Sequence, residues 1–183
     1  MNAEAVQKEN YTVDGKVLPE NTVIYLSADK KTVTIKLPKN FIKVSGGAVI
    51  AINDKVKTIG NVNIADASKV IYVATGLVDN TATQLTYAVK KTNNSIELVF
   101  DENIDDATLV GAEDDFVVKV NGVVYNYTVS TGATADDNKV LLTTIDTFNF
   151  GSVVTVEVTP VEGNITITDT VGNKLGLGAI TAK

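Results

Sequence analysis

The residues best suited to chemistry in this sequence are carboxylates that follow a predicted strand at residues 95–100. Positions 101–106 hold four carboxylates and one amide: Asp101, Glu102, Asn103, Asp105 and Asp106. Ca²⁺ prefers such oxygen ligands, so one hypothesis is a calcium site formed by Asp101, Glu102, Asp105 and Asp106. The spacing is not that of an EF-hand loop. The alternative, preferred here, is that these acids cap backbone groups and keep a strand end soluble.

The composition excludes most other catalytic chemistry. The 183 residues include no Cys, His or Trp, and the 16 basic residues are all Lys. Nucleophilic triads need an imidazole base, and zinc sites almost always need Cys or His ligands. A glycosidase needs only two carboxylates about 5 to 9 Å apart, but a chain with 6% aromatic residues offers few rings for stacking a sugar. We therefore predict a protein that is not an enzyme, with calcium as the one candidate cofactor.

Charge and hydropathy exclude two classes of partner, nucleic acids and the membrane interior. The formal net charge is −6 and the pI is about 4.6, which repels a nucleic acid, and lysine lacks the bidentate guanidinium suited to phosphate. No stretch approaches the roughly 18 apolar residues that span a bilayer, so we expect no membrane insertion. The first residues carry neither the basic region nor the apolar region of a signal peptide. We expect a cytosolic protein or a piece of a longer exported one.

The apolar runs alternate with period two and are rich in Val, Ile, Thr and Tyr, which is typical of strands. Strands are predicted at residues 22–26, 32–37, 48–52, 70–73, 85–89, 95–100, 116–120, 123–129, 140–145, 153–159, 165–168 and 179–181. Asn121-Gly122 suits a tight hairpin turn, because both positions tolerate positive φ. No window of about a dozen residues keeps the helical period. The pattern predicts an all-β chain of two tandem antiparallel immunoglobulin-like β-sandwiches, at 1–80 and 81–183.

The segment that joins the two predicted domains has two interpretations. Residues 70–73 are apolar and could pair as an additional strand of the first sandwich. Alternatively, the connection is a loose linker through residues 74–83, where Gly76, Asp79, Asn80 and Ala82 favour a flexible backbone.

The chain repeats three features in the same order. A strand into Asp14-Gly15 matches a strand into Asn121-Gly122, residues 31–35 match residues 138–142, and Asp54 with Gly60-Asn61 matches Asp169 with Gly172-Asn173. This order resembles the tandem bacterial Ig-like repeats of surface-layer proteins and related cell-wall proteins. In that comparison residues 81–183 form a complete unit, opening with residues 82–85 and 95–102. Residues 1–80 lack this opening and are expected to be N-terminally truncated.

The resemblance implies a structural fragment of a bacterial cell-surface protein whose modules pack into a lattice. Its partners would be neighbouring copies or adjacent domains of the parent chain, with wall polysaccharide bound through domains not present here. The implied location is extracellular, and such lattices often use calcium. The alternative function is an adhesin or spacer module of a wall-anchored protein that binds a polysaccharide or a host ligand. A first domain without its opening strands would also expose a sheet edge, which invites pairing with another chain.

Overall fold

The computed structural model describes residues 1–43, 45–159 and 164–183. Its regular structure consists of strands and short 3₁₀-helices, with no α-helix among these residues. All pairings between named strands are antiparallel. The predicted all-β antiparallel fold is therefore confirmed, whereas the immunoglobulin-like topology stays a prediction. No helix in the described ranges has the length and apolar character needed to cross a membrane.

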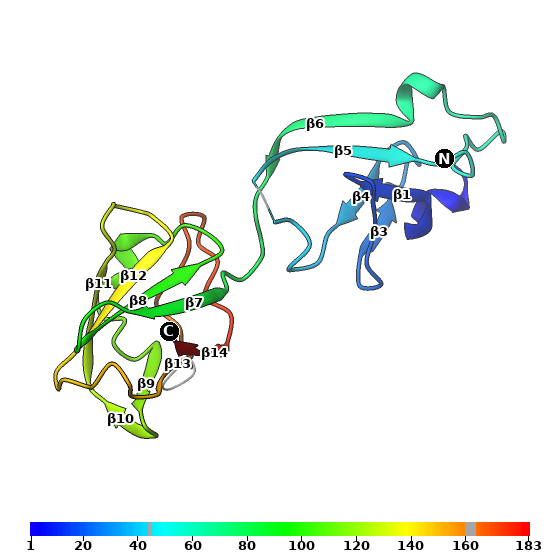
Figure 1. Cartoon of the computed structure of the whole chain (residues 1–183). Coiled ribbons are helices and arrows are strands. Elements are labelled where there is room, and N and C mark those ends of the chain that lie inside the picture. Colours follow the sequence, from blue (N-terminus) through cyan, green and yellow to red (C-terminus); the bar gives the residue numbers. More distant parts are fainter. Residues whose placement is uncertain (44, 160–163) are drawn as a thin grey trace. The chain divides into compact units, whose positions relative to one another are not determined.

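The chain divides into two compact units, Met1–Thr81 and Ala82–Lys183, called unit 1 and unit 2 below. Figure 1 shows both as strand-rich bodies. Each unit is described by itself.

Unit 2 consists of two four-stranded sheets that share one core. The sheets have the orders β11-β12-β8-β7 and β10-β9-β13-β14. The strands are β7 (Leu85–Lys90), β8 (Ser95–Phe100), β9 (Phe116–Val120), β10 (Val123–Tyr125), β11 (Tyr127–Thr131), β12 (Lys139–Thr144), β13 (Val154–Val158) and β14 (Gly178–Ala182), with the 3₁₀-helix η4 (Asp106–Leu109) between β8 and β9. Buried positions alternate along β9, β12 and β13, as half-buried strands require. Leu98 and Val140 from one sheet and Val118 and Val156 from the other belong to the same buried cluster.

Unit 1 has one four-stranded sheet, ordered β2-β1-β5-β6, and a separate hairpin of β3 and β4. Its strands are β1 (Tyr11–Val13), β2 (Lys16–Val17), β3 (Val23–Leu26), β4 (Val33–Lys36), β5 (Gly46–Ile52) and β6 (Val70–Leu77), with 3₁₀-helices η1 (Ala3–Val6), η2 (Lys8–Asn10) and η3 (Asp66–Ser68). Among the described residues, six buried apolar residues form its core, against twenty in unit 2. Unit 1 therefore encloses much less apolar surface than unit 2.

The two units share one turn in detail. Asp14 and Asn121 have left-handed backbones, with φ of 48° and 50°, and the glycine after each also has positive φ. The Asp14 N–H donates to Val49 O and the Val49 N–H donates to Asp14 Oδ1, both at 2.8 Å. Asn121 and Val153 form the same two bonds at 2.8 and 2.9 Å. A short side chain that accepts a hydrogen bond and tolerates positive φ explains why Asp-Gly and Asn-Gly stand at these positions.

Two strand predictions in unit 2 are wrong. Residues 123–129 do not form one strand, because the strand is interrupted at Asn126 and its two halves, β10 and β11, lie in different sheets. Residues 165–168 are not a strand beyond the single bridge of Thr168 with Lys174. The N–H groups of Thr166 and Ile167 donate to the carboxylate of Asp115 in place of a neighbouring strand.

The segment between the units follows the first interpretation of residues 70–73. They begin β6, which pairs with β5 over much of its length. The alternative prediction, a loose linker through residues 74–83, is wrong, because Asp79 is 8% exposed and Thr83 is fully buried. Asn80 Oδ1 accepts hydrogen bonds from the N–H groups of Phe41 and Ile42 at 3.2 and 3.1 Å. These bonds tie the end of unit 1 to the connection between β4 and β5.

Candidate functional site

The acidic turn at 101–106 is engaged with its own backbone. Asp101 Oδ1 accepts a hydrogen bond from the Gln84 N–H at 2.6 Å. Asp105 is the N-cap of η4 and accepts from the Ala107 N–H at 3.0 Å. Asp106 and Asp136 exchange N–H to carboxylate bonds, both at 3.1 Å. These carboxylates satisfy backbone donors at a strand end, at a helix start and between two loops.

The structure does not gather the four calcium candidates into one ligand set. Within residues 1–43, 45–159 and 164–183, no three Asp, Glu, His or Cys side chains are grouped closely enough to hold a metal ion. One oxygen of the turn, Asp106 Oδ1, is buried without a hydrogen-bond partner among the described residues. A calcium ion at Asp101, Glu102, Asp105 and Asp106 stays a prediction, and the contacts described for Asp101, Asp105 and Asp106 are structural.

Glu102 points to a different cluster, at the start of unit 2. Thr83 Oγ1 donates to Glu102 Oε2 at 3.2 Å and lies 3.5 Å from Asp169 Oδ2. Asp169 is 2% exposed and accepts bonds from the N–H groups of Val171 and Asn173, each at 2.8 Å. Burial raises the pKa of Asp169, but its hydrogen bonds, those from Asn173 foremost, outweigh burial and hold the pKa below its usual range.

A second buried carboxylate, Asp115, binds the chain segment that leads to Asp169. It is 1% exposed, and it accepts bonds from the N–H groups of Thr166 at 2.9 Å and Ile167 at 2.7 Å. The structural roles of Asp115 and Asp169 are not evident from the sequence. The available signals were an acid directly before a predicted strand and an acid four residues before Asn173. Neither signal identifies the distant backbone groups that the carboxylates bind.

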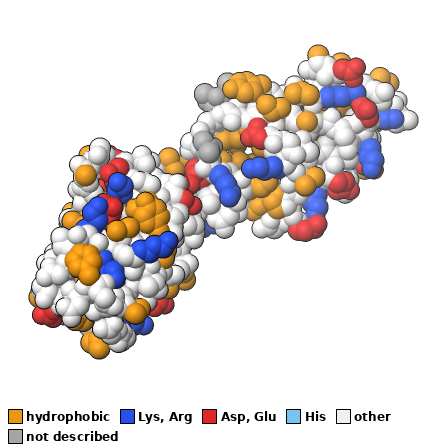
Figure 2. Space-filling view, in the orientation of Figure 1, with side chains coloured by type: hydrophobic (Ala, Val, Ile, Leu, Met, Phe, Trp, Pro, Cys, Tyr) orange, Lys and Arg blue, Asp and Glu red, His pale blue; other side chains and the backbone are white. Residues whose placement is uncertain are grey.

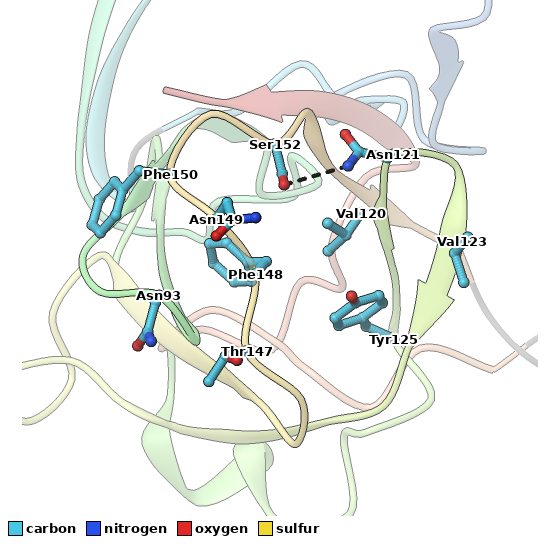
Figure 3. Close-up of a pocket in the computed structure, with 10 residues that line it drawn as sticks. All are labelled: Asn93, Val120, Asn121, Val123, Tyr125, Thr147, Phe148, Asn149, Phe150 and Ser152. Carbon is cyan, nitrogen blue, oxygen red and sulfur yellow. Dashed lines mark hydrogen bonds between the residues drawn. The ribbon is translucent and has the colours of Figure 1, made fainter.

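A hollow of about 560 Å³ lies at one end of unit 2. Its lining comprises Asn93, Val120, Asn121, Val123, Tyr125, Thr147, Phe148, Asn149, Phe150 and Ser152. Figure 3 shows Asn121 bonded to Ser152 at one end of the hollow, with Asn93 and Thr147 at the other. No lining residue carries a charge, so the hollow offers amides, hydroxyls and aromatic rings but not the carboxylate pair of a glycosidase.

The open sheet edges of unit 1 are the second candidate site. In unit 2, β12 pairs with β11 on one side and β8 on the other, whereas β4 pairs only with β3 among the described strands. In unit 2 the chain end after β14 also bonds to β7, through Lys90 N–H to Lys183 O at 2.9 Å and Lys183 N–H to Ala88 O at 3.0 Å. The outer side of β6 has no such partner strand within the described residues. Unpaired edges present rows of backbone donors and acceptors to another strand.

Charged side chains do not form a patch of one sign on the face shown in Figure 2, where acidic and basic groups are interspersed. The closest ion pairs include Lys69 with Asp54 and Asp66, and these side chains lie at the surface. The hydrogen bonds that Lys69 donates to Asp54 and Asp66 raise the pKa of its ammonium group. Exposed pairs of this kind contribute little to stability.

No family model matches the chain, and no curated protein matches it by sequence. Among solved structures it is similar to "Crystal structure of the N-terminal part of the bacterial S-layer protein SbsC", with 16% identity over 56% of this chain and 24% of that one, at a TM-score of 0.43. It is also similar to "Crystal structure of the S-layer protein rSbsC(31-844)", with 17% identity over 55% of this chain and 13% of that one, at a TM-score of 0.44. The chain thus spans a quarter or less of these neighbours. TM-scores below 0.5 do not establish a shared fold.

Proposed function

We propose that the chain is a structural module of a bacterial surface-layer protein, located outside the cell, that assembles with neighbouring copies or adjacent domains. The observation that carries the proposal is the pair of open sheet edges in unit 1, β4 and β6. Backbone groups on such edges bind an added strand without any catalytic apparatus. The sequence resemblance to bacterial Ig-like surface repeats supports the same function.

Side-chain chemistry also favours a structural role over catalysis. The chain has no imidazole, thiol or guanidinium group, and the buried carboxylates of Asp115 and Asp169 are engaged by backbone N–H groups. A carboxylate that binds several backbone donors stabilises a fold and is poorly placed to transfer protons to a substrate. Contacts between copies would therefore be spread over edges and faces, as in a packing module.

Sedimentation velocity over a concentration series, with calcium and then with a chelator, tests this function. Growth into defined oligomers, followed by negative-stain images of sheets, is the expected result. A monomer at every concentration, with and without calcium, would overturn assembly by this chain. Calcium-dependent growth would make Asp106 the first residue of the acidic turn to substitute, since its Oδ1 is the buried oxygen without a partner among the described residues.

The hollow in unit 2 favours a second candidate, an adhesin module for a neutral saccharide. In the described chain, the side chains of Asn93, Thr147, Asn149 and Tyr125 make no hydrogen bond to another residue, which leaves amide and hydroxyl groups for a ligand. Uncharged groups beside an aromatic ring suit a sugar. Titration with neutral oligosaccharides by NMR would distinguish the two functions. Loss of binding in Asn149→Ala, with binding kept in the surface control Asn63→Ala, would support the adhesin.

A further inference from the structure

Unit 1 and the second part of unit 2 have the same strand plan. The orders β2-β1-β5-β6 and β10-β9-β13-β14 correspond strand for strand, as do the hairpins β3-β4 and β11-β12. Local bonds agree as well: Asn53 N–H donates to Asn10 O in unit 1 and Thr159 N–H donates to Asp115 O in unit 2, both at 3.0 Å. The helices η1 and η4 likewise contact the equivalent strands β3 and β11. Two strands of unit 2, β7 and β8, have no counterpart among the described residues of unit 1.

In unit 2 these two strands close the sandwich. β8 pairs with β12 in antiparallel register and buries Ile96, Leu98 and Phe100 almost completely. β7 pairs with β8, and its residues Ala88 and Lys90 bond to the chain end after β14. The β7-β8 hairpin therefore covers both edges that are open in unit 1.

Apolar side chains of unit 1 are less buried than their counterparts in unit 2. Val140 and Leu142 on β12 are fully buried, whereas the corresponding Val33 and Ile35 on β4 are half-buried. Because the Asp14–Val49 and Asn121–Val153 turns are equivalent, Ile50 and Ile52 of unit 1 correspond to Val154 and Val156 of unit 2. The two valines are fully buried and the two isoleucines are half-buried. On the β6 edge Val70, Ile71 and Tyr72 are 60%, 45% and 70% exposed.

Charge indicates which hairpin suits the edge. Unit 1 has ten lysines and eight acidic residues, which gives it a net charge of +2. Since the whole chain has a net charge of −6, unit 2 has a net charge of −8. Lys30 and Lys31 precede β4 where Asp137 and Asn138 precede β12. In unit 2 the strand that pairs with β12 runs into Asp101 and Glu102. A donated inner strand followed by acidic residues would thus end beside Lys30 and Lys31 on unit 1. In unit 2 the equivalent strand, β8, ends beside Asp137.

We infer that the β4 and β6 edges of unit 1, which have no counterpart of β7 and β8 among the described residues, bind a β-hairpin donated by another polypeptide. The hairpin has the chemistry of β7-β8: an inner strand with one apolar face, like that of Ile96, Leu98 and Phe100 on β8, and acidic residues at its end. This inference rests on the proposed structural function, for which it names the docking surface and the partner. It is strand addition, in which backbone bonds give affinity and alternate side chains give specificity.

The pairing predicts a specific pattern of backbone protection. Ser27 and Thr32 are bonded across the β3-β4 hairpin, Ser27 N–H to Thr32 O at 2.9 Å. Because bonded pairs alternate along antiparallel strands, the Thr34 N–H points to β3, and those of Val33 and Ile35 point to the open edge. A donated strand would protect Val33 and Ile35 and leave Thr34 as it was.

The test is amide hydrogen exchange by NMR on the full chain, alone and with a peptide of residues 84–103. Exchange at Val33 and Ile35 is expected to slow by about tenfold or more at saturation. A peptide with Ile96→Asp and Leu98→Asp is the matched control and should have no effect. Leu142, on the paired β12, is the internal reference and should stay protected throughout.

A second arm of the experiment gives a result even if the free peptide aggregates. Residues 82–103 are copied ahead of Met1 through a Gly/Ser linker, and the same two amides are measured. Unchanged exchange in both arms would overturn the inference. Protection without peptide that grows with protein concentration would instead identify a second copy as the occupant, which overturns the hairpin but retains assembly. Monomeric sedimentation combined with peptide protection would refute the proposed assembly and keep the docking surface.

Discussion

Asp115 provides the most direct test of how unit 2 is held together. Its carboxylate accepts the N–H of Thr166 at 2.9 Å and that of Ile167 at 2.7 Å, and the side chain is 1% exposed. Asp115→Ala leaves two backbone donors without an acceptor in a site closed to water. Hydrogen bonds to a charged group contribute about 1.5 to 3 kcal/mol each, so we expect unit 2 to lose about 3 to 6 kcal/mol with both bonds.

Asp114→Ala is the matched control, because Asp114 is the exposed neighbour in the sequence and its side chain makes no hydrogen bond within the described chain. At about 4 °C per kcal/mol for a domain of this size, Asp115→Ala should lower the unfolding temperature by about 12 to 24 °C. Asp115→Asn keeps one acceptor oxygen, so its unfolding temperature should lie between those of Asp115→Ala and Asp114→Ala. Urea and thermal unfolding followed by circular dichroism measure the change. Equal midpoints for Asp115→Ala and Asp114→Ala would refute the assigned role of the carboxylate.

Three further predictions concern single side chains. Asn80→Ala removes two acceptor bonds and should destabilise unit 1 by about 2 kcal/mol in urea, whereas exposed Asn63→Ala should change it by less than about 0.5 kcal/mol. Burial raises the pKa of Tyr11 to about 12, above that of the unfolded chain, so unit 1 should lose about 1.4 kcal/mol per pH unit between pH 10 and 12; Tyr11→Phe, which cannot ionise, should flatten this loss in a pH series. Asp105→Ala removes the N-cap of η4 and should cost about 1 kcal/mol equally in calcium and in chelator; a cost found only in calcium would indicate a metal ligand.

The parts of the fold that depend on neighbouring residues could be predicted from the sequence. The turn at Asn121-Gly122 follows from two residues that tolerate positive φ. The strands at 70–73 and 179–181 follow from apolar, β-branched runs, and both are confirmed as β6 and β14. In each case the determining interactions lie within a few positions of the chain.

The parts that depend on distant backbone groups could not be predicted. Residues 165–168 have the composition of a strand, but their donors are taken by Asp115, about fifty positions earlier. Residues 123–129 alternate without interruption, yet the chain changes sheets at Asn126, whose carbonyl accepts the Ile145 N–H at 2.9 Å. The sequence also favours backbone capping by the acids of 101–106 but does not show which backbone groups they bind. Asp101, Asp105 and Asp106 accept hydrogen bonds from three separate segments.

The difference between the two units links folding to assembly. In the same strand plan, the core cluster holds twenty buried apolar residues where β7 and β8 are present and six where they have no counterpart among the described residues. Stability rises steeply with the apolar surface that a domain buries, so unit 1 should unfold before unit 2. A partner that binds only folded unit 1 stabilises it by mass action, by about 2.7 kcal/mol at a hundred times its Kd. Occupation of the β4 and β6 edges would therefore raise the first unfolding transition and leave the second unchanged, so that the packed module is more stable than the isolated one.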